Sequence, residues 1–285
     1  MPTGASGAAP RLSVVTLSFN QAPFLRRALD SVLAQDWPDV EYIVVDPGSS
    51  DGSRDILAGY AGRLAATILE PDAGPGDGLN KGFARATGKV LAYLNADDAY
   101  LPGAFREAMA AFAAPDRPDV VCGHGLIVDG QGRVVRRLRS APFGLRRFAY
   151  GASVQMQQST FFRADAFRRT PGFNNDNRTC WDAEILMELA KAGARFRIVD
   201  RYWSLFRIYE GSITGSGHLN ARYAEDLARM FQAVMGRPRA PLDGLVGRAL
   251  RLARWATDPV GLAVRLQDKL AGPPACVQDL AAKAA

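Results

Sequence analysis

The chain has 285 residues, of which 48% are hydrophobic and 22% charged, and its formal net charge is +6 at pH 7. These proportions are typical of a soluble globular protein with one large core, or one domain with an appendage. No apolar run approaches the roughly 18–20 residues of a membrane-spanning helix. Residues 1–10 are small and flexible and lack the apolar segment of a signal peptide. The positive charge favours anionic partners such as phosphates, nucleic acid or acidic lipid.

The first hundred residues alternate short apolar strands with amphipathic helices. Strands are predicted at 12–17, 41–46, 66–69 and 90–94, with helices after the turns at 18–21, 47–52 and 72–78. This alternation predicts an α/β fold with a mostly parallel sheet and helices on both faces. No G-x-G-x-x-G follows the first strand and no Walker A loop occurs, which argues against a dinucleotide-binding Rossmann domain.

Two of these strands run into carboxylates. Strand 41–46 ends in Asp46, and strand 90–94 continues into Asp97 and Asp98. Ligands of open α/β sheets bind at the carboxyl ends of the strands, so these side chains would share one crevice if their strands are neighbours. Adjacent carboxylates repel unless a cation lies between them, and Mg²⁺ or Mn²⁺ shares such oxygens with phosphates. We therefore predict a metal–diphosphate site. The alternative is that Asp98 caps a helix starting near Pro102.

The elements after Pro102 are more varied. They are a helix to about 112, a strand at 119–122, a hairpin over 126–135, a loop over 140–155, a strand at 159–163, a short helix at 164–169, a helix at 181–192 and strands at 195–199 and 203–208. The helix at 181–192 carries Asp182 and Glu184 in its first turn, where the macrodipole favours anions.

The composition shifts at about residue 236. A Pro- and Arg-rich linker precedes a helix at 243–256, in which Arg248, Arg251 and Arg254 recur every third residue and Trp255 follows; the segment 259–270 repeats the basic–apolar pattern. A basic amphipathic helix with a tryptophan suits a membrane surface. The alternative is a helix packed on the domain with its arginines in water.

Eight motifs over residues 12–215, taken together in this order, resemble the inverting glycosyltransferases of family 2, of the bacterial surface-glycan type. They are SVVTLSFN at 13–20, VVDPGSSDGS at 44–53, LNKG at 79–82, LNADD at 94–98, QSTFFR at 158–163, GF at 172–173, WDAE at 181–184 and FRIYEGS at 206–212. The resemblance implies a GT-A fold with a C-terminal helical extension. Within it we expect a flexible N-terminus at 1–10, a nucleotide-binding half at 11–100, an acceptor half at 101–235 and a basic helical extension at 236–285.

The resemblance also implies roles for individual residues. Those that would contact the nucleotide are Leu17, Ser18, Asn20, Asp46, Asp77, Lys81 and Asp97. Asp98 would bind Mg²⁺ or Mn²⁺, and Asp182 matches the catalytic base. The side chains around the donor and acceptor sugars would be Trp181, Gln158, Arg207 and Tyr209. The residues alone also allow purely structural roles. Asp46 could cap the next turn, Lys81 could be a solvated helix residue, and Asp182 could be only a charge at a helix start.

Three positions depart from the family pattern. Pro47 stands where relatives often have Asp or Gly, and Gln157 and Tyr209 stand where His is frequent. If that His assists the metal or the diphosphate in relatives, the Tyr209 hydroxyl could donate a hydrogen bond to a phosphate oxygen here. His218 lies close enough in sequence to substitute for the missing His.

The implied reaction moves a sugar from a nucleotide diphosphate, first of all UDP, to a hydroxyl of a glycan or lipid-linked acceptor. Inversion is one in-line displacement, so a single ionised carboxylate suffices as general base while the metal neutralises the departing diphosphate. The alternatives are a sugar nucleotidyltransferase, which would usually show a Gly-rich basic loop after the first strand, and a catalytically silent nucleotide-sugar-binding domain. Nucleic acid is not an expected partner, because the basic residues concentrate at 133–147 and 237–265.

The same features predict where the protein acts. The cysteines Cys122, Cys180 and Cys276 are far apart and lack metal-site spacing, which indicates a reducing compartment. We expect a cytoplasmic protein that contacts the inner face of the membrane through 243–270.

Overall fold

The computed structural model describes residues 9–212, 219–270 and 272, so His218 and Cys276 lie outside the described residues. The strands are β1 Leu12–Leu17, β2 Val40–Val45, β3 Ala66–Ile68, β4 Val90–Asn95, β5 Ala99–Tyr100, β6 Val120–Val128, β7 Val134–Leu138, β8 Thr160–Arg163 and β9 Phe196–Arg207. The helices are α1 Ala22–Leu33, α2 Ser53–Ala58, α3 Pro75–Arg85, α4 Ala104–Phe112, α5 Leu145–Ala149, α6 Ala164–Phe167, α7 Trp181–Lys191, α9 Asn220–Met235, α10 Asp243–Thr257 and α11 Pro259–Leu270, with 3-10 turns η1 Ala61–Arg63 and η2 Gln157–Ser159.

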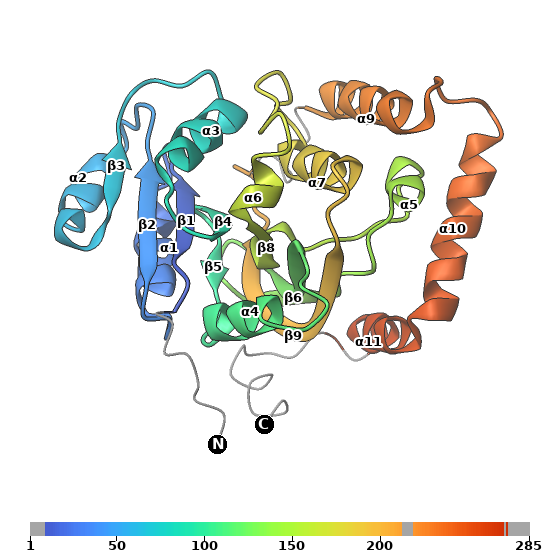
Figure 1. Ribbon diagram of the computed structural model, residues 1–285, viewed down its shortest axis with the longest axis horizontal. Coiled ribbons are helices and arrows are strands. Elements are labelled where there is room, and N and C mark those ends of the chain that lie inside the picture. The colour runs from blue at the N-terminus through green and yellow to red at the C-terminus, as the bar shows by residue number, and fades with distance from the viewer. Residues whose placement is uncertain (1–8, 213–218, 271, 273–285) are drawn as a thin grey trace.

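One mixed sheet organises the described part of the chain (Figure 1). Its strand order is β3-β2-β1-β4-β8-β6-β9-β5, and β7 pairs with β6 outside this path. The strands β3, β2, β1 and β4 are parallel, as the alternating sequence predicts, and β6 and β9 form a second parallel pair. The remaining pairs are antiparallel: β8 with β4 and β6, β7 with β6, and β5 with β9. The α/β expectation is confirmed.

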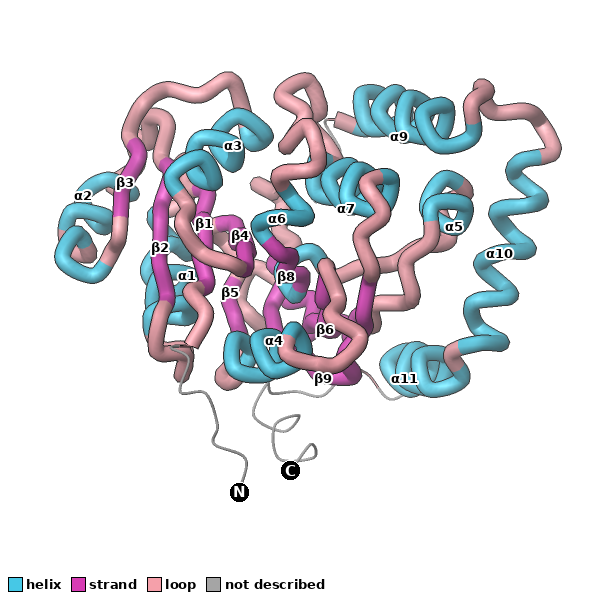
Figure 2. The backbone as a smooth tube through the Cα atoms, in the orientation of Figure 1, coloured by secondary structure: helices cyan, strands magenta, loops and turns pink. Residues whose placement is uncertain are grey.

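Helices cover both faces of the sheet (Figure 2). On one face, Val14 of β1 packs in a core cluster with Leu29 of α1 and Phe105 of α4. On the other face, Val15 packs with residues of α3 and α7, including Phe83 and Ile185. Successive strand residues point to opposite faces, so adjacent valines in one strand serve two different cores. This double burial explains why the strands are continuous apolar runs.

Several elements differ from the sequence prediction. β6 is one continuous strand through Gly123 and Gly125, where the sequence predicts a strand at 119–122 and a separate hairpin over 126–135. A side chain at either glycine would collide with Trp203 or Met156, so the glycines let these two side chains pack directly on the strand backbone. β9 is likewise continuous across 200–202, the predicted loop over 140–155 contains α5, and α9 was not predicted.

The C-terminal helices α10 and α11 lie at the edge of the molecule opposite β3 and α2 (Figure 1). Val246 and Leu250 of α10 pack against a small core formed by Ala149, Tyr150 and Phe231. α11 is held on β7 by Asp268, whose carboxylate accepts hydrogen bonds from Arg137 N at 2.9 Å and Nε at 2.8 Å. No helix in the described residues combines the length and the apolar character needed to cross a membrane. The domain boundaries at 10, 100 and 235 stay predictions.

Candidate active site

The carboxyl ends of β2, β1 and β4 bring three groups of predicted site residues to one edge of the sheet. Leu17 pairs in register with Val45 of β2 and Asn95 of β4, so the residues that follow these strands are neighbours. The amide of Ala96 donates to the carbonyl of Leu17 at 2.9 Å. β2, β1 and β4 are therefore neighbours, which is the condition for their carboxyl ends to form one crevice.

Asp46 is fully buried and anchors the turn that follows β2. Its carboxylate accepts hydrogen bonds from Ser18 Oγ at 3.1 Å, Ser49 N at 2.8 Å and Gly48 N at 3.2 Å, and Arg54 Nε lies 3.3 Å away. Burial acts to raise the pKa of Asp46, but the hydrogen bonds from Ser49, Gly48 and Arg54 outweigh it and the pKa is lowered. Asp46 is thus an ionised turn cap, as the alternative held. Its contact with a nucleotide stays a prediction.

Asn20 joins the loop after β1 to the loop after β2. Its backbone is left-handed, with φ of 52°, a conformation that asparagine tolerates. Its Oδ1 accepts a hydrogen bond from Ser50 N at 2.9 Å, and its own N–H donates to Ser49 Oγ at 2.8 Å. The two loops therefore form one surface beside Leu17 and Ser18.

Asp77 and Lys81 form an ion pair at the start of α3, with 2.9 Å between Lys81 Nζ and Asp77 Oδ2. Asp77 Oδ2 also accepts from Ala73 N at 2.8 Å, and Lys81 Nζ donates to the carbonyl of Pro71 at 2.7 Å. The hydrogen bond from Ala73, followed by Lys81, lowers the pKa of Asp77. Lys81 is therefore a tethered cation rather than a freely solvated side chain. Its contact with a diphosphate remains a prediction.

Asp98 is 2% exposed and held from two distant elements. Its Oδ2 accepts from Gln158 Nε2 at 2.8 Å, and its Oδ1 accepts from the backbone N–H of Arg207 at 2.9 Å. Burial raises the pKa of Asp98 well above its ordinary value, and the charge of Asp97 raises it further. The alternative of a helix cap is wrong, because α4 begins at Ala104 with Gly103 as its N-cap.

Arg207 fastens the Asp97–Asp98 turn to the β6–β7 hairpin. Its Nε donates to the carbonyl of Asp97 at 3.0 Å, and its Nη1 donates to the carbonyls of Asp129 at 2.8 Å and Gly130 at 3.2 Å. Its guanidinium carbon lies 4.6 Å from the ring centre of Phe24. The structure thus gives Arg207 a clamping role on the backbone, whereas the sequence predicted a pocket residue.

Tyr209 connects the end of β9 to the loop after β1. Its hydroxyl donates to Gln21 Oε1 at 3.1 Å, and its ring meets Phe24 edge-on at 5.0 Å. Gln157, the other departure from the family pattern, donates from Nε2 to the carbonyl of Tyr93 at 3.1 Å. Both side chains therefore tie loops to the edge of the sheet where Asp98 lies.

The donor set suits a hard divalent cation. The described residues contain no group of three or more His, Cys, Asp or Glu side chains able to hold a metal ion. Mg²⁺ and similar ions commonly take only one or two protein carboxylates and complete their shell with water and phosphate oxygens. The carboxylate of Asp97 forms no ion pair within the described residues, and each oxygen of Asp98 accepts one hydrogen bond and keeps a second lone pair. Asp98, with Asp97 beside it, fits the predicted ion.

Asp182 lies in the first turn of α7, which begins after Cys180. Burial raises the pKa of this carboxyl, and the backbone N–H of Ala183 partly offsets the effect. Tyr93 of β4 lies close enough that, after burial, the charge of Asp182 helps to raise the pKa of the Tyr93 phenol. A carboxylate with a raised pKa is a better proton acceptor than a solvated one.

Glu184 holds the start of α7 in place. Its carboxylate accepts from Asn177 Nδ2 at 2.7 Å and Arg229 Nη2 at 2.9 Å, which connects α7 to the preceding loop and to α9. Burial acts to raise the pKa of Glu184, but the hydrogen bond from Arg229 and those from the asparagines lower it. These contacts fix the first turn of α7, which carries Asp182.

Two buried donors near Asp182 have no hydrogen-bond partner in the described structure: Tyr93 Oη and Trp181 Nε1. Tyr93 is 2% exposed and Trp181 8%, and both belong to the core between the sheet and α7. Buried polar atoms are usually paired, so two unpaired ones need an explanation. A pocket role was predicted for Trp181, whereas no feature of the sequence pointed to Tyr93, which lies inside an apolar strand.

Asn80 is a further residue whose role the sequence did not reveal. Its Nδ2 donates to the carbonyl of Phe173 at 2.8 Å, and its Oδ1 accepts from Phe173 N at 2.9 Å. A Cβ at Gly76 would lie 2.8 Å from the carbonyl oxygen of Asn174. The glycine-rich start of α3 and Asn80 thus let α3 hold the loop that leads into α7.

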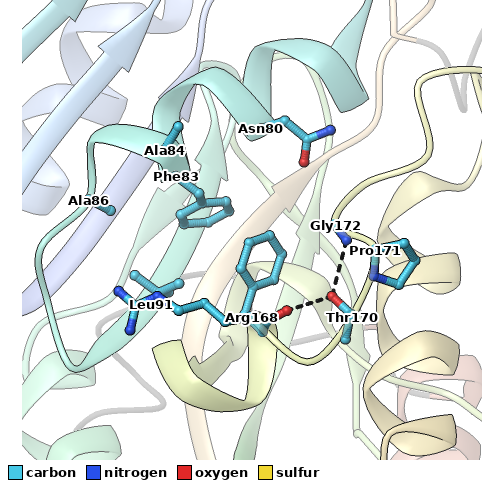
Figure 3. Close-up of a pocket in the computed structure, with 10 residues that line it drawn as sticks. Asn80, Phe83, Ala84, Ala86, Leu91, Arg168, Thr170, Pro171 and Gly172 are labelled. Atoms are coloured by element: carbon cyan, nitrogen blue, oxygen red, sulfur yellow. Dashed lines mark hydrogen bonds between the residues drawn. The ribbon is translucent and has the colours of Figure 1, made fainter.

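A cleft of about 370 Å³ opens between α3 and the segment 167–172 (Figure 3). Phe83 and Phe167 line it with ring centres 5.2 Å apart, and Thr170 Oγ1 donates to the carbonyl of Phe167 at 2.7 Å. Arg168 is the charged residue of its lining, which contains no carboxylate. We therefore assign no catalytic step to this cleft.

Sequence comparison shows where related proteins align. The model of the family described as "Glycosyl transferase family 2" matches residues 13–170. An uncharacterised glycosyltransferase of Nostoc sp. is 38% identical over 128 residues, which cover 44% of this chain and 39% of that protein. One of Mycobacterium tuberculosis is 32% identical over 184 residues, covering 64% and 70%. A putative teichuronic acid biosynthesis glycosyltransferase of Bacillus subtilis is 39% identical over 92 residues, covering 31% and 36%.

Comparison of structures supports the fold. S. aureus TarS in complex with UDP-GlcNAc superposes with a TM-score of 0.61 at 19% identity, over 91% of this chain and 77% of that one. The mannosyltransferase PcManGT of Pyrobaculum calidifontis, in complex with GDP-Man and Mn²⁺, gives a TM-score of 0.61 at 22% identity, over 96% and 79%. The match in architecture and the family match over more than half of the sequence agree: the chain belongs to glycosyl transferase family 2 and has its GT-A fold.

Proposed function

We propose that this protein transfers a sugar, with inversion, from a nucleotide diphosphate donor to an acceptor hydroxyl. The observation that carries the proposal is the placement of Asp98 at the carboxyl end of β4, next to β1, with its oxygens oriented by Gln158 and Arg207. Two adjacent carboxylates held there, without an ion pair to either, match the needs of a metal–diphosphate site.

The roles of the chain's own residues follow from this arrangement. The interlocked loops after β1 and β2 would receive the base and ribose beside Leu17, Ser18 and Asn20. Asp98 and Asp97 would hold the ion and with it the diphosphate. A bound Mg²⁺ or Mn²⁺ acts as a Lewis acid that stabilises the negative charge of the leaving diphosphate.

Asp182 would serve as the general base. Burial raises the pKa of Asp182, and a general base is most effective when its pKa approaches the working pH. It would take the proton of the acceptor hydroxyl while that oxygen attacks the anomeric carbon and the bond to the diphosphate breaks. A second carboxylic acid, which a glycosidase needs to protonate its leaving group, is not required.

The unpaired donors Tyr93 Oη and Trp181 Nε1 complete the proposal. Both are buried near Asp182, where a sugar would lie during transfer. A sugar hydroxyl is a suitable acceptor for either, and pairing on binding would remove the cost of their burial.

UDP is the first candidate nucleotide, because the solved TarS complexes hold UDP and UDP-GlcNAc, whereas PcManGT holds GDP-Man. Assembly of a cell-surface glycan is the proposed context, because the Bacillus subtilis relative is a putative glycosyltransferase of teichuronic acid biosynthesis. The acceptor class is accordingly a glycan or a lipid-linked glycan.

Titration calorimetry tests the proposal directly. UDP, GDP and dTDP are titrated, each with and without Mn²⁺, into the wild type, Asp98→Asn and the control Asp116→Asn, whose side chain is exposed and distant in sequence from the site. We expect one nucleotide to bind in a metal-dependent manner, Asp98→Asn to abolish this binding and Asp116→Asn to preserve it. Absence of binding for all three nucleotides would overturn the proposal.

Turnover separates the remaining alternatives. A transferase should slowly hydrolyse the sugar nucleotide whose nucleotide binds, and Asp182→Asn should stop this. Binding without hydrolysis or transfer would favour a silent binding domain. Release of pyrophosphate from a nucleoside triphosphate and a sugar phosphate would favour a nucleotidyltransferase.

A further inference from the structure

The two C-terminal helices carry apolar residues that the fold does not bury. On α10, Leu245, Ala249, Leu252 and Ala256 follow one another at intervals of four, three and four residues, which places them on one face. Leu245 is 58% exposed and Leu252 is 70% exposed. The same helix uses Val246 and Leu250 for its contact with the domain. α10 therefore has a second apolar stripe, which a helix on a water-exposed surface would not need.

α11 also exposes apolar side chains, with Leu266 and Leu270 one turn apart on one face and Val260 at the start of the helix on another. Val260, Leu266 and Leu270 are 53%, 49% and 86% exposed, while Asp268 faces the domain and pairs with Arg137. Each helix is thus fixed to the domain by one side and presents apolar side chains on another.

A group of arginines lies between the two helices. Arg248, Arg251 and Arg254 of α10 and Arg265 of α11 line a pocket of about 420 Å³ together with Leu252 and Trp255. The guanidinium carbons of Arg254 and Arg265 lie 4.5 Å and 5.2 Å from the ring centre of Trp255. The lining residues include no acidic side chain. Of the three aspartates in 243–270, Asp243 and Asp268 pair with Arg237 and Arg137, and Asp258 acts on Arg254 from outside the pocket lining.

Several like charges crowd this pocket. Burial, and then the charges of Arg265 and Arg251, lower the pKa of the Arg254 guanidinium, while Asp258 acts in the opposite direction. An anion in the pocket would relieve this repulsion, and arginine binds phosphate oxygens with its planar fork of donors.

We propose that α10 and α11 form a docking surface for an anionic membrane, in which lipid phosphates enter the Arg248–Arg265 pocket and the leucines of both helices enter the lipid interface. Exposed apolar side chains, flanking arginines and a tryptophan form the combination that lies in an interfacial layer. Charge attraction alone would need no leucine stripe, which separates this surface from one for nucleic acid. A symmetric contact with a second copy would bring arginines against arginines, which charge repulsion disfavours. The surface lies at the edge of the molecule (Figure 1), where a membrane can reach it.

Vesicle co-sedimentation of the full chain tests the proposal. The probes are phosphatidylcholine vesicles with and without phosphatidylglycerol, at low and raised salt. The charge variant is Arg248→Gln with Arg265→Gln, and the apolar variant is Leu245→Ser with Leu252→Ser. The matched control is Arg63→Gln with Arg106→Gln, which removes the same charge from exposed arginines elsewhere.

We expect the wild type to sediment with the vesicles that contain phosphatidylglycerol and not with those of phosphatidylcholine only. Raised salt should release it. The charge variant should lower the partition coefficient roughly 30-fold, the change that two basic residues near an anionic surface account for. The apolar variant should also bind less, and the control should bind as the wild type does. All these variants change exposed residues, so circular dichroism should show unchanged folding.

Three outcomes would overturn the proposal. The first is absence of wild-type binding to anionic vesicles, and the second is binding that neither variant changes. The third is binding to single-stranded DNA that the charge variant loses and the apolar variant keeps, without vesicle binding, which would assign the surface to nucleic acid. If vesicle binding is absent, light scattering would assign the surface to a dimer interface when the wild type dimerises and the apolar variant does not.

Discussion

Replacing Arg207 with methionine should destabilise the protein and loosen its predicted metal site. The guanidinium donates three hydrogen bonds, to the carbonyls of Asp97, Asp129 and Gly130, and the side chain is almost fully buried. A buried carbonyl left without its donor costs about 1–3 kcal/mol. Methionine would keep much of the contact with Phe24, and water can reach part of the turn. We therefore expect a net loss of about 3–5 kcal/mol in the free energy of unfolding.

In a domain of this size such a loss lowers the thermal midpoint by roughly 6–15 °C. Arg207→Lys keeps the charge but not the fork of donors, so its loss should be intermediate. Arg85→Met on α3 is the control, because it changes an exposed arginine. Thermal unfolding should show a lower midpoint for Arg207→Met, and titration with Mn²⁺ and nucleotide should show weaker binding by the same variant. A midpoint as high as that of Arg85→Met would refute the clamping role of Arg207.

Four further expectations concern Asp182 and Asn80. Asp182→Asn should lower turnover about 10²- to 10⁴-fold, and the same variant should be more stable than the wild type at neutral pH in urea denaturation. Burial raises the folded-state pKa of Asp182 above its unfolded value, so stability is lost as pH rises through that interval, and asparagine removes this loss. In the wild type, the rate should fall on the acid side with an apparent pKa above that of a solvated aspartate; a limb at the ordinary value would contradict the role of burial. Asn80→Ala should cost about 1–2 kcal/mol and speed hydrogen exchange at the amide of Phe173; unchanged exchange would show that α3 does not hold this loop.

The parallel half of the sheet could be predicted because its local signals agree. β1, β2 and β4 are mostly apolar runs followed by turn residues, and most of their residues are buried, whereas the edge strand β3 is short and half-buried. Periodicity, burial and turn chemistry point to the same elements there. The strand order was not predicted; the structure shows that β1 lies between β2 and β4, which places Asp46 and Asp98 at one edge of the sheet.

The later half was harder because tertiary contacts override local signals. β6 continues through Gly123 and Gly125, between the predicted strand and the predicted hairpin, and Trp203 and Met156 pack on its backbone there. α9 pairs Arg229 with Glu184, a contact separated by 45 residues that no local pattern reveals. The same holds for Asn80 and Tyr93, whose roles depend on partners or missing partners far along the chain.

The candidate site also shows why local rules fail where function is expected. Asp97 and Asp98 are adjacent and largely buried, and neither forms an ion pair in the described structure. The positive charge that acts on both is that of Arg207, whose guanidinium donates its hydrogen bonds to backbone carbonyls. In an apo protein this arrangement raises the free energy of the folded state, because both carboxyl pKa values are driven upward by burial. Departures of this kind from the local rules of stability are expected at functional sites. The arrangement becomes favourable when a ligand supplies positive charge, since binding to the folded state alone stabilises it. The cost of holding Asp98 between Gln158 and Arg207 is therefore the strongest physical reason to regard this edge of the sheet as the active site.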